Sequence, residues 1–95
     1  MIRFKPIPGI VLTNICGEYL LVAAKSLRGS VPYLSQLNES SAFLWRRLEN
    51  GSDEDELIKA VLNEYEIEDP ASARSAVQRF VEQMLQAGYL RKEGD

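Results

Sequence analysis

The sequence predicts an α+β fold of the winged helix-turn-helix kind, in which a three-stranded antiparallel sheet is followed by three helices. Up to residue 37, the apolar residues are β-branched or aromatic and form short runs separated by turns. From residue 38 onward, they recur at helical spacing instead. With 95 residues, of which 45% are hydrophobic, the chain is expected to form one domain spanning residues 1–95.

Three extended runs make up the predicted sheet. Ile10–Ile15 and Glu18–Ala23 are separated by a two-residue break that ends in Gly17, which is the pattern of a β-hairpin. Val31–Leu37 follows after a polar turn and supplies the third strand. Because Pro32 has no N–H group to give to a ladder, we expect this strand to lie at the sheet edge, with Pro32 near its beginning.

The first two helices are marked by capping residues. Asn38 is expected to cap a first helix that Gly51 stops in the left-handed conformation. The apolar face of that helix is expected to leave Trp45 toward one flank. Ser52 is expected to cap a second helix, whose acidic first turn, Asp53–Glu56, suits the positive end of the helix dipole.

The third helix is expected to open at Asp69 and Pro70, in the order of a capping residue followed by proline, and to end at Gly88. A short charged tail is expected at Arg91–Asp95. The predicted core stripe of this helix comprises Ala73, Ala76, Val77, Phe80, Val81, Met84 and Leu85.

Composition excludes most catalytic chemistry. The absence of histidine rules out Ser-His-Asp triads, Cys-His pairs and histidine-ligated metals, and a single cysteine cannot form an internal disulfide or a cysteine-rich metal cluster. The carboxylates of Asp53–Glu56 lie side by side along a helix and do not converge on one substrate atom, so a small hydrolase or lyase is a weak alternative. We therefore expect no catalytic residue, no cofactor and no metal site.

The cellular setting is predicted from two further observations. No apolar run has the length of a signal peptide or of a membrane span, so we expect no membrane association. The lone Cys16 beside a predicted turn suits a reducing compartment, and the sequence places no cation or base beside it to make it reactive. These features predict a cytoplasmic protein.

The segment Tyr33–Trp45 (YLSQLNESSAFLW) is an extended run that ends in Leu-Asn-Glu and is followed by small residues and an apolar pair. In this it resembles the PqqD-like proteins, the peptide-recognition elements in the biosynthesis of ribosomally made, post-translationally modified peptides. Leu48–Ser52, the apolar stripe of Leu57–Tyr65 and the closing segment Phe80–Leu90 also match the family's pattern. Their order and spacing, over about Tyr19–Leu90, carry the resemblance.

The resemblance implies a non-catalytic module that binds the leader segment of a precursor peptide as an additional strand at the sheet edge. The free edge is expected at Val31–Leu37, facing the third helix. A separate enzyme, a radical-SAM maturase or another peptide-modifying enzyme, would act on the rest of the peptide. The residues expected to contact the peptide are Val31, Pro32, Tyr33, Leu34, Ser35 and Gln36 on the strand and Ala73, Ala76 and Phe80 on the helix.

Other interpretations of these residues stay open. Pro32 and Ser35 on an edge strand also protect against aggregation, and Ala73 and Ala76 also suit close helix packing without a groove. The segment Met1–Ile7 could cover the sheet edge. The protein is expected to be a monomer or a strand-exchanged dimer.

DNA binding through a helix-turn-helix is the alternative function. Its recognition helix would start at Asp69 and present Arg74 and Arg79 to the bases. The formal net charge of −3 and the acidic residues just before this helix oppose binding to phosphates, so we expect no nucleic-acid partner.

Overall fold

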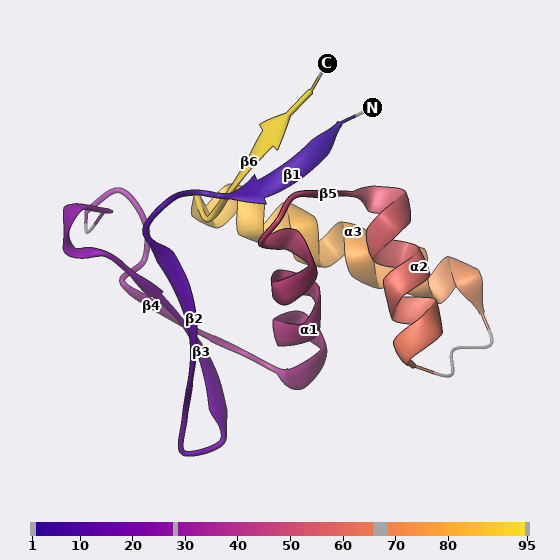
Figure 1. Cartoon of the computed structure of the whole chain (residues 1–95), viewed down its shortest axis with the longest axis horizontal. Coiled ribbons are helices and arrows are strands. Elements are labelled where there is room, and N and C mark those ends of the chain that lie inside the picture. The colour runs from indigo at the N-terminus through magenta and orange to yellow at the C-terminus, as the bar shows by residue number, and fades with distance from the viewer. Residues whose placement is uncertain (1, 28, 66–68, 95) are drawn as a thin grey trace.

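Two three-stranded antiparallel sheets and three α-helices form the fold in the computed structural model, which describes residues 2–27, 29–65 and 69–94 (Figure 1). The sheets have the strand orders β5–β1–β6 and β2–β3–β4. In chain order the elements are β1 (Arg3–Pro6), β2 (Ile10–Ile15), β3 (Glu18–Ala23), a 3₁₀ turn η1 (Lys25–Leu27), β4 (Leu34–Leu37), α1 (Glu39–Leu48), β5 (Ser52–Asp53), α2 (Glu54–Glu64), α3 (Pro70–Ala87) and β6 (Leu90–Glu93).

The predicted meander is confirmed as the β2–β3–β4 sheet. The hairpin register runs from Ile10 opposite Ala23 to Ile15 opposite Glu18. Between the strands, Cys16 has a φ of 53° and Gly17 a φ of 81°, the left-handed pair that a tight two-residue hairpin turn requires. In Figure 1 this hairpin projects away from the helices.

The third strand is shorter than the predicted Val31–Leu37. Its ladder with β3 covers only Leu34–Leu37, while Val31, Pro32 and Tyr33 precede it. The N–H of Val31 donates to the carbonyl oxygen of Leu27 at 3.2 Å, and Pro32 has no N–H to give. The chain therefore enters the sheet only after Pro32, although the carbonyl of Tyr33 still accepts from Ala23 N–H at 2.9 Å.

The β5–β1–β6 sheet was not predicted. β1 lies in its centre, with Arg3 opposite both Asp53 on β5 and Glu93 on β6. The N-terminal arm thus pairs with these two strands and not with β4, so it does not cover that edge. The expected charged tail at residues 91–95 is also corrected, because its residues up to Glu93 belong to β6. Both outer strands are too short and polar to show an apolar alternation in the sequence.

The helices begin close to their predicted starts, with two corrections in α1 and α2. The N-cap of α2 is Asp53, not Ser52: its side chain accepts from Glu56 N–H at 2.8 Å, and Glu56 returns a bond to the Asp53 N–H, which completes a capping box. Ser52 instead belongs to β5. Trp45, expected at the flank of α1, is fully buried and packs edge-to-face on Tyr89, with ring centroids 6.5 Å apart.

α3 begins and ends as predicted. Asp69 caps it, Pro70 is its first residue, and Gly88 ends it with a φ of 88°. A Cβ atom on Gly88 would lie 2.8 Å from Cγ1 of Val31, so this position also needs glycine for the close approach of the segment before β4. One residue of the predicted stripe departs from the core, because Ala76 is exposed.

The helices and the inner face of the β2–β3–β4 sheet enclose the core. Its largest fully buried side chains are Trp45, Tyr89, Leu21, Leu48, Leu57 and Val77. Among the residues that the structure describes, none of the helices is long and apolar enough to cross a membrane.

Candidate functional site

The outer edge of β4 has backbone groups that pair with no strand in the described part of the chain. β4 pairs only with β3, and the Tyr33 carbonyl points toward β3 because it accepts from Ala23. Bonding directions alternate along a strand, so Ser35 and Leu37 also bond toward β3. The N–H and C=O groups of Leu34 and Gln36 consequently face the open edge.

Tyr89 fixes the position of this edge from the core side. Its hydroxyl donates to the carbonyl oxygen of Pro32 at 2.9 Å. Since that bond uses the single phenolic proton, Ser35 Oγ donates to Tyr89 Oη in the contact of 2.6 Å between them. The strand is thereby held at two points, while Leu34 on the opposite face remains 52% exposed.

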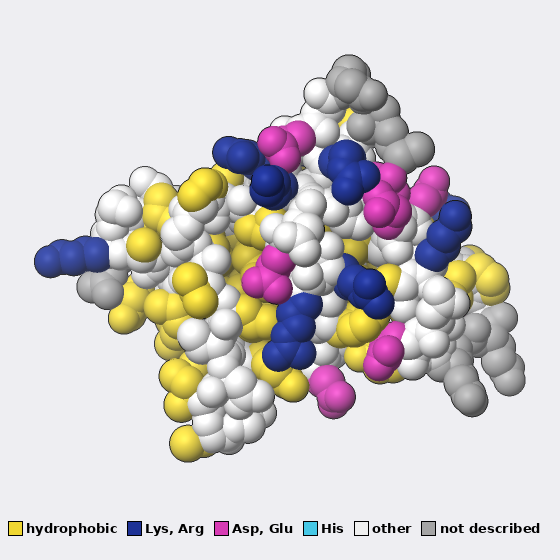
Figure 2. All heavy atoms as spheres, viewed as in Figure 1, with side chains coloured by type: hydrophobic (Ala, Val, Ile, Leu, Met, Phe, Trp, Pro, Cys, Tyr) yellow, Lys and Arg dark blue, Asp and Glu magenta, His cyan; other side chains and the backbone are white. Residues whose placement is uncertain are grey.

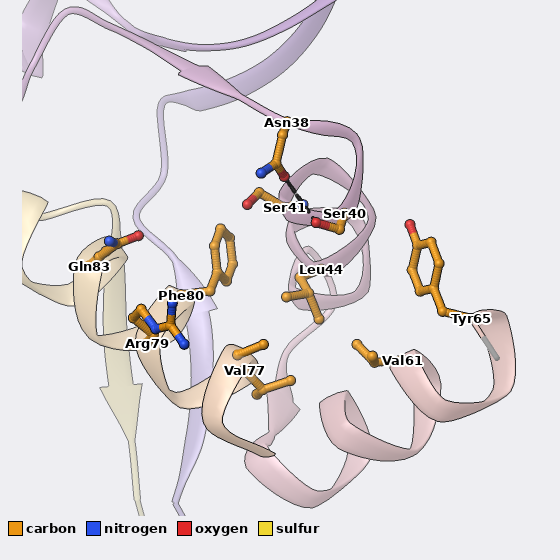
Figure 3. Close-up of a pocket in the computed structure, with 11 residues that line it drawn as sticks. Asn38, Ser40, Ser41, Leu44, Val61, Tyr65, Val77, Arg79, Phe80 and Gln83 are labelled. Atoms are coloured by element: carbon orange, nitrogen blue, oxygen red, sulfur yellow. Dashed lines mark hydrogen bonds between the residues drawn. The ribbon is translucent and has the colours of Figure 1, made fainter. Parts of the chain in front are cut away.

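A groove lies beside the end of β4. It encloses about 520 Å³ and runs between the start of α1, the end of α2 and one face of α3 (Figure 3). Buried side chains of all three helices form its apolar surface, and polar groups form its rim. The lining residues are Asn38, Ser40, Ser41, Leu44, Val61, Tyr65, Ala76, Val77, Arg79, Phe80 and Gln83.

Asn38 joins the strand edge to the groove. It directly follows β4, and its side-chain oxygen accepts from the Ser41 N–H at 2.8 Å and from the Ser40 hydroxyl at 3.0 Å. These bonds are the N-cap of α1, so the capping residues that start this helix also line the groove.

The two ends of the groove differ in charge. Arg79 and Gln83 of α3 lie at one side, and Tyr65 at the end of α2 lies at the other (Figure 3). Burial raises the pKa of the Tyr65 hydroxyl, and the negative charges of Glu39 and Glu64 raise it further. Two carboxylates thus act on the hydroxyl at the Tyr65 end, whereas the cationic Arg79 lies at the other end.

The structure separates the residues expected at the site into three groups. Ala76 and Phe80 line the groove. Ala73 is only 1% exposed and is packed in the core, so the close-packing interpretation is the correct one for this residue. On the strand, three of the six residues belong to β4 and three precede it. Those in β4 are Leu34, Ser35 and Gln36, and those before it are Val31, Pro32 and Tyr33.

The sequence analysis did not predict most of the residues that line the groove. Helical spacing could have identified two of them, because Arg79 and Gln83 follow Ala76 by three and seven positions and so share its helix face. The residues of α1 and α2 carried none, since only the packing of the helices brings them to α3. Within the described residues, no group of three or more Cys, Asp or Glu side chains is arranged to hold a metal ion.

The arrangement suits the binding of an extended chain. The groups of Leu34 and Gln36 can complete a backbone ladder, and the groove can accept a side chain from the added strand. The DNA-binding alternative gains nothing from the geometry, because Arg74 lies 3.8 Å from Glu54 and Arg79 lines the groove.

Comparison with known proteins gave one family and two similar structures. Residues 28–90 match the model of the family described as coenzyme PQQ synthesis protein D (PqqD). The structure described as TbiB1 in complex with the TbiA(beta) leader peptide is 20% identical, with a TM-score of 0.75 over 96% of this chain and 99% of that one. Lasso peptide synthetase B1 complexed with the leader peptide is also 20% identical, with a TM-score of 0.73 over 93% and 96%. No curated protein sequence matched.

Proposed function

Because this chain belongs to the PqqD family, we propose that it binds the leader segment of a ribosomally made precursor peptide and presents it to a separate modifying enzyme. The observation that carries this proposal is the open edge of β4, which lies beside an apolar groove. Both similar structures are, by their descriptions, complexes with leader peptides, and they share this fold.

In the proposed complex, the leader adds as a strand along β4. Its backbone bonds to the N–H and C=O groups of Leu34 and Gln36, and one of its apolar side chains enters the groove against Phe80. Each ladder bond contributes about 0.5–1.5 kcal/mol net, so the ladder orients the peptide and the anchor adds hydrophobic affinity.

The protein itself performs no chemistry in this proposal. Among the described residues, the groove lining has no carboxylate and no thiol, so it offers no carboxylate base to activate the hydroxyls of Ser40, Ser41 and Tyr65. A radical-SAM maturase or another peptide-modifying enzyme acts on the part of the precursor that extends from the groove. Binding of the leader raises the effective concentration of the precursor at the modifying enzyme, because it holds the rest of the peptide nearby. We place this event in the cytoplasm, whose reducing conditions suit the exposed free thiol of Cys16.

A scan with N-methylated peptides tests strand addition. Peptides from the N-terminal segments of short reading frames beside the gene are first titrated against ¹⁵N-labelled protein. The best binder is then methylated at one backbone nitrogen at a time. Methylation should weaken binding about tenfold or more at alternate positions, where the N–H faces β4, and have little effect at the positions between.

Two results would overturn the proposal. Binding with no alternation in the scan, or with amide shifts away from Leu34, Gln36 and α3, would exclude strand addition at β4. Tight binding of short duplex DNA that weakens steeply with salt would indicate a DNA-binding protein instead.

A further inference from the structure

Among the residues that the structure describes, Arg79 is the only cationic side chain that lines the groove, and no carboxylate in that part of the chain pairs with it. The other described arginines each contact a carboxylate or an aromatic ring. Those near a carboxylate are Arg3 (Glu56, 2.6 Å), Arg74 (Glu54, 3.8 Å) and Arg91 (Glu93, 3.6 Å), and those over a ring are Arg46 (Tyr19, 5.3 Å) and Arg47 (Phe43, 5.4 Å). Arg79 thus differs from the other described arginines, because it lines the groove and, within the described part of the chain, contacts neither a carboxylate nor an aromatic ring.

The surroundings of Arg79 define what it can bind. Phe80, the next residue along α3, contributes to the apolar surface of the groove together with Leu44 and Val77. A ligand side chain on that surface would exclude water from one side of the guanidinium. An Arg–carboxylate bond is stronger when it is partly desolvated and bidentate, so this position favours an anionic group beside an apolar one.

The far end of the groove opposes an anion. Tyr65 lies there, and the negative charges of Glu39 and Glu64 act on its hydroxyl. An acidic ligand group would be repelled at that end and attracted at the end with Arg79. The charge difference therefore fixes the placement of an acidic peptide along the groove.

We infer that the leader carries an Asp or Glu whose carboxylate pairs with Arg79, two or four residues from the apolar side chain that enters the groove. Residues two apart in an extended strand point to the same face and are separated by about 6.6–6.8 Å, which suits neighbouring sites on one groove. This inference rests on the proposed function and specifies the class of peptide that the site accepts.

Selection from a displayed library of random peptides tests the inference and does not require the natural ligand to be identified first. Three baits are compared: the wild-type protein, Arg79→Glu and Arg74→Glu. Arg74 is the matched control, because it lies on the same helix and is also exposed but does not line the groove. Both side chains are on the surface, so reversing either charge should leave the fold intact, which circular dichroism and thermal unfolding would verify.

The wild type and Arg74→Glu should enrich peptides with Asp or Glu at a fixed spacing from an apolar residue. Arg79→Glu should enrich Lys or Arg at that same spacing. For the best wild-type peptide, Arg79→Gln should weaken binding about tenfold, and replacing the peptide's acidic residue by its amide should weaken it to a similar extent.

The outcomes separate the two proposals. Enriched peptides with no acidic preference, or with one that Arg79→Glu does not change, would overturn the pairing with Arg79 and leave peptide binding standing. A library from which the wild type enriches no peptide at all would overturn the proposed function and this inference together.

Discussion

The β5–β1–β6 sheet and the β2–β3–β4 sheet each have three strands, but they differ in how their edges are held. In the first, Arg3 of the central strand donates to Glu56 at 2.6 Å and to the carbonyl of Gly51 at 2.9 Å, which ties β1 to α2 and to the loop before β5. Its outer strand β6 carries charged side chains, a common protection against further pairing.

The β2–β3–β4 sheet lacks such protection at β4. The strand, Leu34–Leu37, has no charged residue, and Asn38, which directly follows it, lines the groove. Figure 2 shows hydrophobic side chains over this part of the molecule, whereas Lys, Arg, Asp and Glu gather over the helices and the β1–β6 region. The difference is the one that the proposed addition of a peptide strand at β4 requires.

Tyr89 connects the two sheets, so removing its side chain should lower the free energy of unfolding more than any other change predicted below. Its carbonyl accepts from Ile7 N–H at 2.9 Å beyond β1, and its hydroxyl holds Pro32 and Ser35 at β4. Tyr89→Ala should lower the free energy of unfolding by about 3–5 kcal/mol, as large-to-small core changes do. Urea unfolding measures this effect.

Tyr89→Phe separates the hydrogen bonds from the packing. It should cost about 1–3 kcal/mol, because Ser35 Oγ and the Pro32 carbonyl lose their partner. Amide hydrogen exchange should accelerate in β4 and stay slow in β1 and β6. Equal acceleration in both sheets would contradict the separate roles assigned to them.

Filling the groove should affect binding and leave stability nearly unchanged. Ala76→Trp places a large side chain in the lining, and because Ala76 is exposed the fold should tolerate it within about 0.5 kcal/mol. Affinity for a selected peptide, measured by isothermal titration calorimetry, should fall at least about tenfold. Ser75→Trp is the control, because Ser75 is exposed on the same helix outside the lining. An equal loss in both variants would remove Ala76 from the site.

Lowering the pH should weaken the β5–β1–β6 sheet before the β2–β3–β4 sheet. The loss of stability should be smaller than that of the Tyr89 variants. The N–H of Glu56 bonds to the Asp53 carboxylate and, together with Arg3, holds its pKa below the ordinary 3.8. A carboxylate with a lowered folded pKa stabilises the fold fully above its unfolded pKa, and this contribution is lost as the pH falls through the folded pKa. The β2–β3–β4 sheet carries one carboxylate, Glu18.

Urea unfolding over the acid range measures this dependence, with Asp53→Asn as the comparison. Asparagine retains a capping oxygen but not the charge, so the variant should lose less stability than the wild type on acidification below about pH 4. An unchanged slope in the variant would show that Asp53 does not contribute to the acid sensitivity.

Where the sequence predicted structure correctly, the signal was local. Asn38 and Asp69 cap their helices through bonds to N–H groups two or three residues away, and the Cys16–Gly17 turn depends on its own dihedral angles. The cap of α2 was misplaced by one residue because Ser52 and Asp53 are both good capping residues, and pairing with Phe4 draws Ser52 into β5.

The candidate site was predictable only in part. The edge position of β4 was expected from Pro32, which directly precedes the segment that enters the sheet, whereas Ala76 was expected in the core stripe of α3 and is exposed. Whether Ala73 lined a groove or the core was undetermined, because alanine is compatible with both, and the structure places it in the core. Tyr65 and Leu44 reach the groove only through the packing of three helices.

By itself, the sequence determined the hairpin turn and the N-caps of α1 and α3, because each depends on neighbours within a few residues. Only the tertiary structure decided that the N-terminal arm pairs with β6 and leaves the edge of β4 open. That pairing joins Arg3 to Glu93, from opposite ends of the chain, and a contact across such a separation leaves no pattern in either short segment. The tertiary structure also decided that Arg79 and Tyr65 line one groove, because only the packing of α2 against α3 places them at its two ends.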